Sequence, residues 1–181
     1  TTEIYTLSLH DALPILLPPR LLSLFVSAFQ SFLFNRTVSA RMREGRSLSL
    51  PSPGDRLVFE GGREDRVTAG NMRAAEAQQK RGRCRIAIFI PGSRDFEPGG
   101  PDDEVMASLV ADYAITPGDF QRASEFVGVR YDGALRPASL TTDVRTEISG
   151  MDLTLSFSLP PGHYATTVCR EFMKADPLQM I

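Results

Sequence analysis

The chain has 181 residues, of which 42% are hydrophobic and 23% charged, and its formal net charge is −2. This balance is that of an ordinary packed protein, and it excludes a disordered, collagen-like or disulfide-scaffold chain. The small net charge hides two opposite halves: residues 20–85 contain 13 Lys and Arg against 6 Asp and Glu, and residues 86–181 contain 7 against 14. Since 18 of the 20 cations are arginine, which suits phosphate groups, the basic half indicates a polyanionic partner.

The first 15 residues read TTEIYTLSLHDALPI and resemble a translated sequencing adapter, so we expect them to be non-native. In that case the native chain begins upstream and the polypeptide is truncated. The alternative is a genuine edge strand, because residues 4–7 favour extended structure. Full burial of Ile4, Leu7 and Leu9 in a core would contradict the first interpretation.

Neither a membrane segment nor a disulfide is expected. The apolar run at residues 21–35 is short for a membrane span and contains Ser, Gln and Asn, and the chain start has no basic secretory region. The two cysteines, Cys84 and Cys169, lie far apart without ligand spacing, which indicates a reduced, cytoplasmic chain with no metal.

From residue 21 onward, hydrophobic spacing and turn signals predict both helices and strands. The longest helix has apolar residues three and four positions apart and stops at Gly45. Two later strands form a hairpin around Ser149-Gly150, and alternate residues of the second strand are apolar. The predicted helices are 21–44, 71–80 with Asn71 as N-cap, 102–113, one opened by residues 116–119, and 164–174; the predicted strands are 56–60, 86–90, 140–148 and 152–159.

Two groups of arginines are candidates for phosphate contacts. Arg81, Arg83 and Arg85 alternate along a segment that enters a strand, and this spacing predicts that they share one face. The alternative is a charged guard on an edge strand, which uses the same pattern. The second group lies toward the end of the long helix and consists of Arg36, Arg41, Arg43 and Arg46.

No motif for hydrolysis or nucleotide binding occurs: the chain has no GxGxxG, GxxxxGK[ST], HExxH or GxSxG pattern. The acid pair Glu64-Asp65 is predicted to lie in a loop, and Asp102-Asp103 to complement the dipole at a helix N-terminus. His163, in a turn, is expected to be a surface or hydrogen-bonded residue.

Three stretches carry the landmarks of one family in the same order and spacing. They are residues 24–41 (LFVSAFQSFLFNRTVSAR); Gly54-Asp55 with residues 88–92 (IFIPG); and residues 155–173 (LSFSLPPGHYATTVCREFM). These are similar to an S-A-x-x-S-x-L-F-N helix, to G-D and L-P-G landmarks, and to a closing F-x-L-P-x-G-S-[YF]-A-T-x-x-x-R-E-[IL]. Together they resemble the TruD family of tRNA pseudouridine synthases over residues 16–174. One departure is His163, which stands where the family usually has Ser and puts any contact from that hydroxyl in doubt.

The resemblance implies an isomerase that detaches, rotates and rejoins a uridine base in RNA, with no cofactor and no metal. The family's catalytic aspartate lies in a G-x-K-D-x-x-A-x-T segment, and this chain does not contain that segment. We therefore expect no catalytic residue in this chain and no activity from the chain alone. The Arg130-Tyr131-Asp132 string superficially resembles the R-x-D of other pseudouridine synthases, but Asp132-Gly133 is an ordinary turn pair and not the expected nucleophile.

The implied fold is α+β. Residues 16–138 are expected to form mainly the family's insertion domain, with the long first helix packing on the catalytic domain, and residues 139–181 the C-terminal hairpin and helix of the catalytic sheet. The implied partners are RNA, tRNA in particular, and the missing N-terminal half of the same protein; the alternative is a non-catalytic RNA-binding or protein-interaction module. The expected RNA-binding residues are Arg36, Arg41, Arg43, Arg81, Arg83 and Arg85, and the expected active-site rim is Gly162, His163 and Tyr164.

Overall fold

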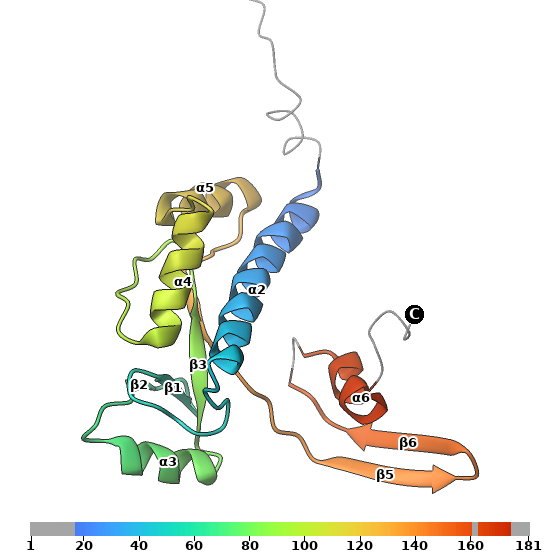
Figure 1. Ribbon diagram of the computed structural model, residues 1–181. Helices are drawn as coiled ribbons and strands as arrows, with labels where there is room; N and C mark the ends of the chain where they lie inside the picture. The colour runs from blue at the N-terminus through green and yellow to red at the C-terminus, as the bar shows by residue number, and fades with distance from the viewer. Residues whose placement is uncertain (1–16, 161–162, 175–181) are drawn as a thin grey trace, which may run out of the picture. The chain divides into compact units, whose positions relative to one another are not determined.

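The computed structural model describes residues 17–160 and 163–174, and the chain divides into two compact units (Figure 1). The first unit ends at Ser139 and the second begins at Leu140. Residues 1–15 lie outside the described residues, so the expectation that they are non-native stays a prediction. The assignment of the two units to an insertion domain and a catalytic piece also stays a prediction.

A four-stranded antiparallel sheet, in the order β2-β1-β3-β4, forms the centre of the first unit. The long strand β3 is an inner strand and places Ile86 opposite Leu57 and Ile88 opposite Arg136 (Figure 1). The sequence pattern predicts neither edge strand, because both are short and carry charged or proline residues. The strands are β1 (Arg56–Phe59), β2 (Glu64–Arg66), β3 (Cys84–Ile90) and β4 (Ala134–Pro137).

The helices of this unit begin and end at the signals that the sequence carries. The described helices are α2 (Pro19–Arg43), α3 (Met72–Lys80), α4 (Pro101–Asp112) and α5 (Pro117–Val127). Three of them start with proline, whose missing N–H costs nothing in a first turn. Helix α2 ends before Gly45, which adopts a left-handed φ of +71°. The helix start predicted at residues 116–119 is confirmed: Thr116 is the N-cap of α5, and its N–H donates to the Asp119 carboxylate at 2.8 Å.

Asn71 stands at the predicted N-cap position of α3, but its side chain does not act as the cap. Asn71 precedes α3, but its side chain makes no hydrogen bond to the first turn of that helix. It instead accepts from the N–H of Thr68 at 2.7 Å and donates to the carbonyl of Arg66 at 2.9 Å. The side chain therefore closes the loop between β2 and α3.

The helices α2, α3 and α4 cover one face of the sheet. Leu57 and Ile86 pack there with Ala75 of α3 in one buried cluster. Ile88 packs on the same face with Leu33 of α2 and Met106 of α4. The core of the unit therefore lies between this face and three helices.

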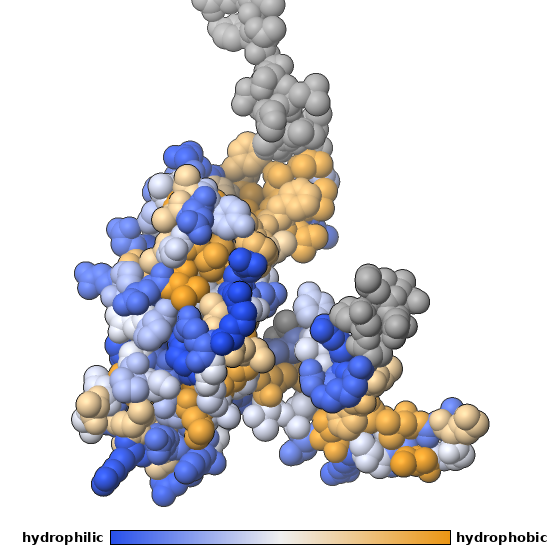
Figure 2. Space-filling model, in the orientation of Figure 1, coloured by the Kyte–Doolittle hydropathy of each residue, from blue (hydrophilic) through white to orange (hydrophobic). Residues whose placement is uncertain are grey.

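Helix α2 is buried along only part of its apolar surface. Leu33 and Thr37 are fully buried, whereas Leu24 and Phe25 near its start are 60% and 53% exposed. Figure 2 shows this hydrophobic surface over the N-terminal half of the helix. Of the helices described, α2 is long and apolar enough to cross a membrane, a property that core helices of soluble proteins share. The expectation that α2 is not a membrane span stays a prediction, because only 11% of its apolar window is buried.

The second unit contains a β-hairpin and one helix. Strands β5 (Val144–Ser149) and β6 (Asp152–Phe157) pair antiparallel and are followed by α6 (Ala165–Met173). Because Ser149 pairs with Asp152, the two-residue turn is Gly150-Met151, one position later than predicted, and Gly150 has a φ of +63°. The first strand also begins at residue 144 and not at 140.

Candidate functional site

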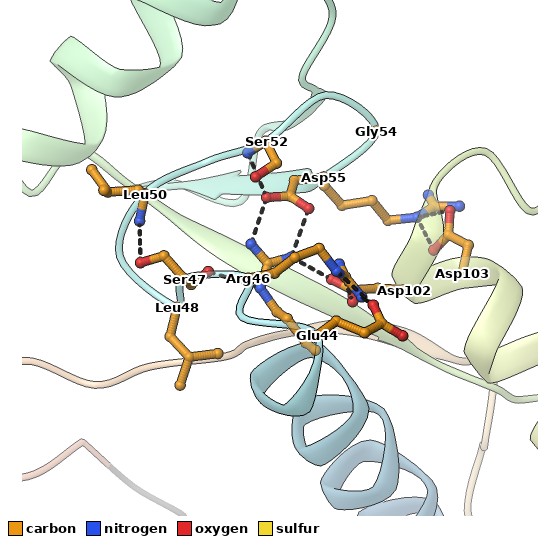
Figure 3. Close-up of polar contacts among 12 residues, drawn as sticks. Glu44, Arg46, Ser47, Leu48, Leu50, Ser52, Gly54, Asp55, Asp102 and Asp103 are labelled. Carbon is orange, nitrogen blue, oxygen red and sulfur yellow. Dashed lines mark hydrogen bonds and ion pairs between the residues drawn. The ribbon is translucent and has the colours of Figure 1, made fainter.

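A buried ionic cluster is centred on Arg41, near the end of α2, and Figure 3 shows three of the residues around it, Arg46, Asp55 and Asp102. Its Nη1 donates to Asp55 Oδ1 at 2.6 Å and to Asp102 Oδ2 at 2.6 Å, and its Nη2 donates to Asp55 Oδ2 at 2.7 Å. Its Nε donates to the carbonyl of Ser47 at 2.8 Å. Arg41 has 0% of its surface exposed. The prediction that Arg41 binds RNA is therefore wrong, because the guanidinium is enclosed and four of its five N–H donors are occupied by protein groups.

Two glycines allow the carboxylates to converge on Arg41. Gly54 has a φ of +90°, and a Cβ added to Gly100 would lie 2.2 Å from the carbonyl oxygen of Gly54. The loop before β1 and the start of α4 thus meet backbone to backbone, which brings Asp55 and Asp102 to the same guanidinium (Figure 3). This contact gives a structural reason for the Gly54-Asp55 landmark.

The interpretation of Asp102-Asp103 as dipole partners alone is incomplete. Asp103, 3% exposed, accepts from Arg56 Nε at 2.8 Å and from Arg66 Nη2 at 2.8 Å. Asp102 also pairs with Arg46 Nη1 at 2.7 Å. Both carboxylates therefore tie α4 to other elements of the unit. The acid pair Glu64-Asp65 was expected in a loop and lies instead in β2.

The electrostatics of the Arg41 cluster keep it charged. Burial by itself lowers the pKa of the Arg41 guanidinium, but hydrogen bonds and charges from Asp55 and Asp102 outweigh burial and raise that pKa above its ordinary value. The cluster is therefore a structural tie, in which Arg41 holds Asp55 and Asp102 together inside the protein. Among residues 17–160 and 163–174, no group of three or more His, Cys, Asp or Glu side chains is placed to hold a metal ion.

The arginines at the α3–β3 junction are the more accessible candidates. Arg81 is the C-cap of α3, Gly82 turns the chain with a φ of +70°, and Arg83 leads into β3, which contains Arg85. Arg81 and Arg83 are exposed and Arg85 is half-buried. The predicted alternation along one strand is therefore wrong for Arg81, although the three residues do gather at one end of the sheet. We call this group, with Lys80, the basic corner.

Two further predicted RNA contacts lie on the surface of α2. Arg36 and Arg43 are both exposed, and Arg43 Nε donates to the carbonyl of Ser39 at 3.2 Å. No carboxylate within the described residues pairs with either guanidinium. These charges are therefore accessible to an external anion.

The expected active-site rim is only partly described. Gly162 lies outside the described residues. His163 is exposed, with its Nδ1 3.2 Å from the carbonyl oxygen of Pro160, and Tyr164 is 76% exposed at the start of α6. Their role at a rim stays a prediction. Asp132, which is not the expected nucleophile, accepts from Ser93 Oγ and Arg94 Nη2, both at 3.2 Å.

Comparison with known proteins finds relatives over most of the chain. Residues 6–172 match the family described as tRNA pseudouridine synthase D (TruD). The probable tRNA pseudouridine synthase D of Natronomonas pharaonis is 36% identical over 161 residues, which cover 85% of this chain and 36% of that protein. The tRNA pseudouridine synthase D of Syntrophotalea carbinolica is 35% identical over 164 residues, or 88% of this chain and 39% of that protein.

A solved structure shows the same fold. The crystal structure of a TruD protein from Methanosarcina mazei matches with a TM-score of 0.73 at 27% identity, over 90% of this chain and 40% of that chain. This likeness confirms the predicted α+β class. The chain spans less than half the length of each of these relatives. The family match begins at residue 6, inside the segment expected to be non-native, and leaves that expectation open.

Proposed function

Because the chain belongs to the tRNA pseudouridine synthase D (TruD) family, we propose that it is part of a cytoplasmic enzyme that isomerises uridine to pseudouridine in tRNA. The observation that carries this proposal is the family match over residues 6–172. In this reaction the bond between N1 and C1′ of the uridine breaks, a bond between C5 and C1′ forms, the proton of C5 leaves to solvent, and N1 takes up a proton. The chain would contribute RNA contacts and part of the catalytic fold.

We propose that these 181 residues do not catalyse the reaction alone. The family's aspartate segment, G-x-K-D-x-x-A-x-T, is absent from the sequence, and the chain spans 39% of the Syntrophotalea carbinolica relative. The test is tritium release from tRNA labelled at C5 of uridine, with that full-length relative as the positive control. We expect tritium from the control and none from this chain; release by this chain at a comparable rate would contradict its inactivity.

The proposed RNA grip uses the exposed arginines and leaves out Arg41. Its five members are Arg36, Arg43, Arg81, Arg83 and Arg85. None of them pairs with a carboxylate among the described residues, so each guanidinium can bind a phosphate. If all five contact phosphate, log K should fall against log salt with a slope of about −3.5, at about −0.7 per contact. Filter binding of unmodified tRNA across a salt series measures this slope, and a flat line would contradict the grip.

The apolar surfaces of both units fit the missing half of the enzyme as their partner. In β5–β6 one face pairs Val144 with Phe157 and Ile148 with Leu153, and Ile148 is 80% exposed. Figure 2 shows hydrophobic surface on this hairpin as well as on the start of α2. Exposed apolar area of this kind marks an interaction site. We propose that the N-terminal part of the same enzyme covers both surfaces.

A second candidate function is a non-catalytic RNA-binding module. The absent aspartate segment favours it for the chain as it stands, because the arginines can bind RNA without that segment. The two candidates differ once the rest of the enzyme is supplied. Tritium release restored by adding the separately expressed N-terminal part of the Syntrophotalea carbinolica relative would favour the enzyme, and RNA binding without any restoration would favour the module.

A further inference from the structure

The sheet of the first unit has one face that its helices do not cover. Side chains alternate along a strand, so Val58 and Arg85 point away from the face on which Leu57 and Ile86 pack with α3. Val58 and Arg85 are directly opposite each other in the β1–β3 register, and their side chains are therefore neighbours on this second face.

A cavity of 230 Å³ opens on this face at the basic corner. Val58 and Pro137 provide apolar lining, and Arg83 and Arg85 provide charge. Neither guanidinium pairs with a carboxylate of the described residues, although Glu60 also lines the cavity. Arg85 is half-buried, and holding a charged group there without a protein partner is unfavourable unless water or a ligand anion satisfies it.

A second cavity on the same face lacks these properties. It is lined by Arg56 and Arg66, but both guanidiniums are bound to Asp103. The carboxylates of Asp95 and Glu97 line it as well, so negative charge balances or exceeds positive charge around it. An RNA phosphate would be repelled there, and the first cavity is the better anion site.

We propose that the cavity between Arg83, Arg85, Val58 and Pro137 holds one unpaired nucleotide of the RNA. This inference rests on the proposed RNA-binding function and names the site that binds an unpaired part of the RNA. The guanidiniums would take the phosphate, and the apolar walls the base or ribose. The volume is below the roughly 300–1,000 Å³ of pockets for drug-sized ligands, which suits one base or ribose with its phosphate outside, at the guanidiniums. A base within a duplex is stacked and paired, so only a splayed base enters such a cavity.

The test compares two fluorescein-labelled RNAs, a stem-loop with an unpaired loop and a fully paired duplex of equal length, by anisotropy across a salt series. Arg85→Gln should weaken stem-loop binding by about tenfold and make the salt slope shallower by about 0.7. The matched control is Arg73→Gln, an exposed arginine of α3, which should weaken binding by less than about twofold because it does not line the cavity.

Two further variants separate the contribution of the cavity to RNA binding from that of the overall positive charge. Val58→Phe fills the cavity without changing the charge, and should weaken stem-loop binding while leaving the salt slope unchanged. Glu60→Gln removes the carboxylate that lines the cavity, and should tighten binding. Thermal melts followed by circular dichroism show whether each variant keeps its fold.

The outcomes distinguish a failure of the cavity proposal from a failure of the proposed function. Equal losses for Arg85→Gln and Arg73→Gln, or equal affinity for the duplex and the stem-loop, would overturn the cavity while RNA binding stands. Failure of the unmodified chain to bind tRNA or either RNA would overturn the proposed function as well. A loss confined to the stem-loop and to the cavity variants supports the inference.

Discussion

Replacing Arg41 with leucine should strongly destabilise the first unit. The variant deletes the guanidinium that donates to Asp55 and Asp102. Asp102 retains Arg46 at 2.7 Å, but Asp55, with 1% of its side chain exposed, retains only the N–H of Ser52 at 2.8 Å among the described partners of its carboxylate. The expected loss is therefore that of one uncompensated buried carboxylate, about 3–5 kcal/mol.

Urea unfolding followed by far-ultraviolet circular dichroism measures this loss. Natural domains are stable by about 5–15 kcal/mol, so the variant should lose a large share of the free energy of unfolding. The control is Arg122→Leu, which breaks the ion pair with Asp119 on α5. That arginine is 73% exposed, and its pair should contribute less than about 1 kcal/mol.

A double variant tests whether the loss comes from the orphaned carboxylate. Arg41→Leu with Asp55→Asn removes the uncompensated charge, so it should be more stable than Arg41→Leu alone. The reasoning fails if Arg41→Leu unfolds within about 0.5 kcal/mol of Arg122→Leu, the scatter expected of an ordinary surface substitution.

Three smaller predictions follow from local geometry. Hydrogen bonds from Thr116 hold the pKa of Asp119 below its ordinary value. The ionised Asp119 carboxylate therefore stabilises the fold fully above the ordinary aspartate pKa, and this stabilisation is lost as the pH falls through the lowered pKa of the folded chain. NMR titration of Thr116→Val should show that pKa rise, and an unchanged value would contradict the cap. Burial raises the pKa of the Cys84 thiol, so iodoacetamide should label Cys84 much faster in urea than in the folded chain; equal rates would show that it is accessible. An alanine Cβ at Gly92 would lie 2.0 Å from a backbone nitrogen and should prevent native packing, whereas at Gly118 it meets nothing closer than 3.6 Å and should preserve the melting temperature; matching melts would refute this contrast.

The sequence predicts the regular elements where the signals are local. The long helix expected at residues 21–44 is observed as Pro19–Arg43, because proline and glycine act on the residues beside them. The hairpin was predicted one residue out of register, since either Ser149-Gly150 or Gly150-Met151 can supply a positive φ. The edge strands β2 and β4 exist through their pairing with neighbours distant in the chain, which no local pattern records.

The candidate site shows where such reasoning stops. Arg41 shares its helix and its local composition with Arg36 and Arg43, yet it alone of these three is buried. Its partners lie 14 and 61 positions away, so its role depends on tertiary packing that a local pattern does not contain. The sequence held one clue to the partner of Arg41, the Gly54-Asp55 landmark. Gly54 lies against the backbone of Gly100, and this close contact fixes the position of the neighbouring Asp55.

The hairpin unit has regular secondary structure but no buried core among its described residues. Within residues 140–160 and 163–174 no residue is buried, and a two-stranded hairpin in water is marginal by itself. The hairpin therefore depends on a partner for its stability. A surface that covers Ile148 and Leu153 binds only the folded strands, so its binding free energy stabilises the folded hairpin. The melting temperature of this segment should climb with the concentration of that surface and drop on dilution, behaviour that belongs to a complex and not to a lone polypeptide.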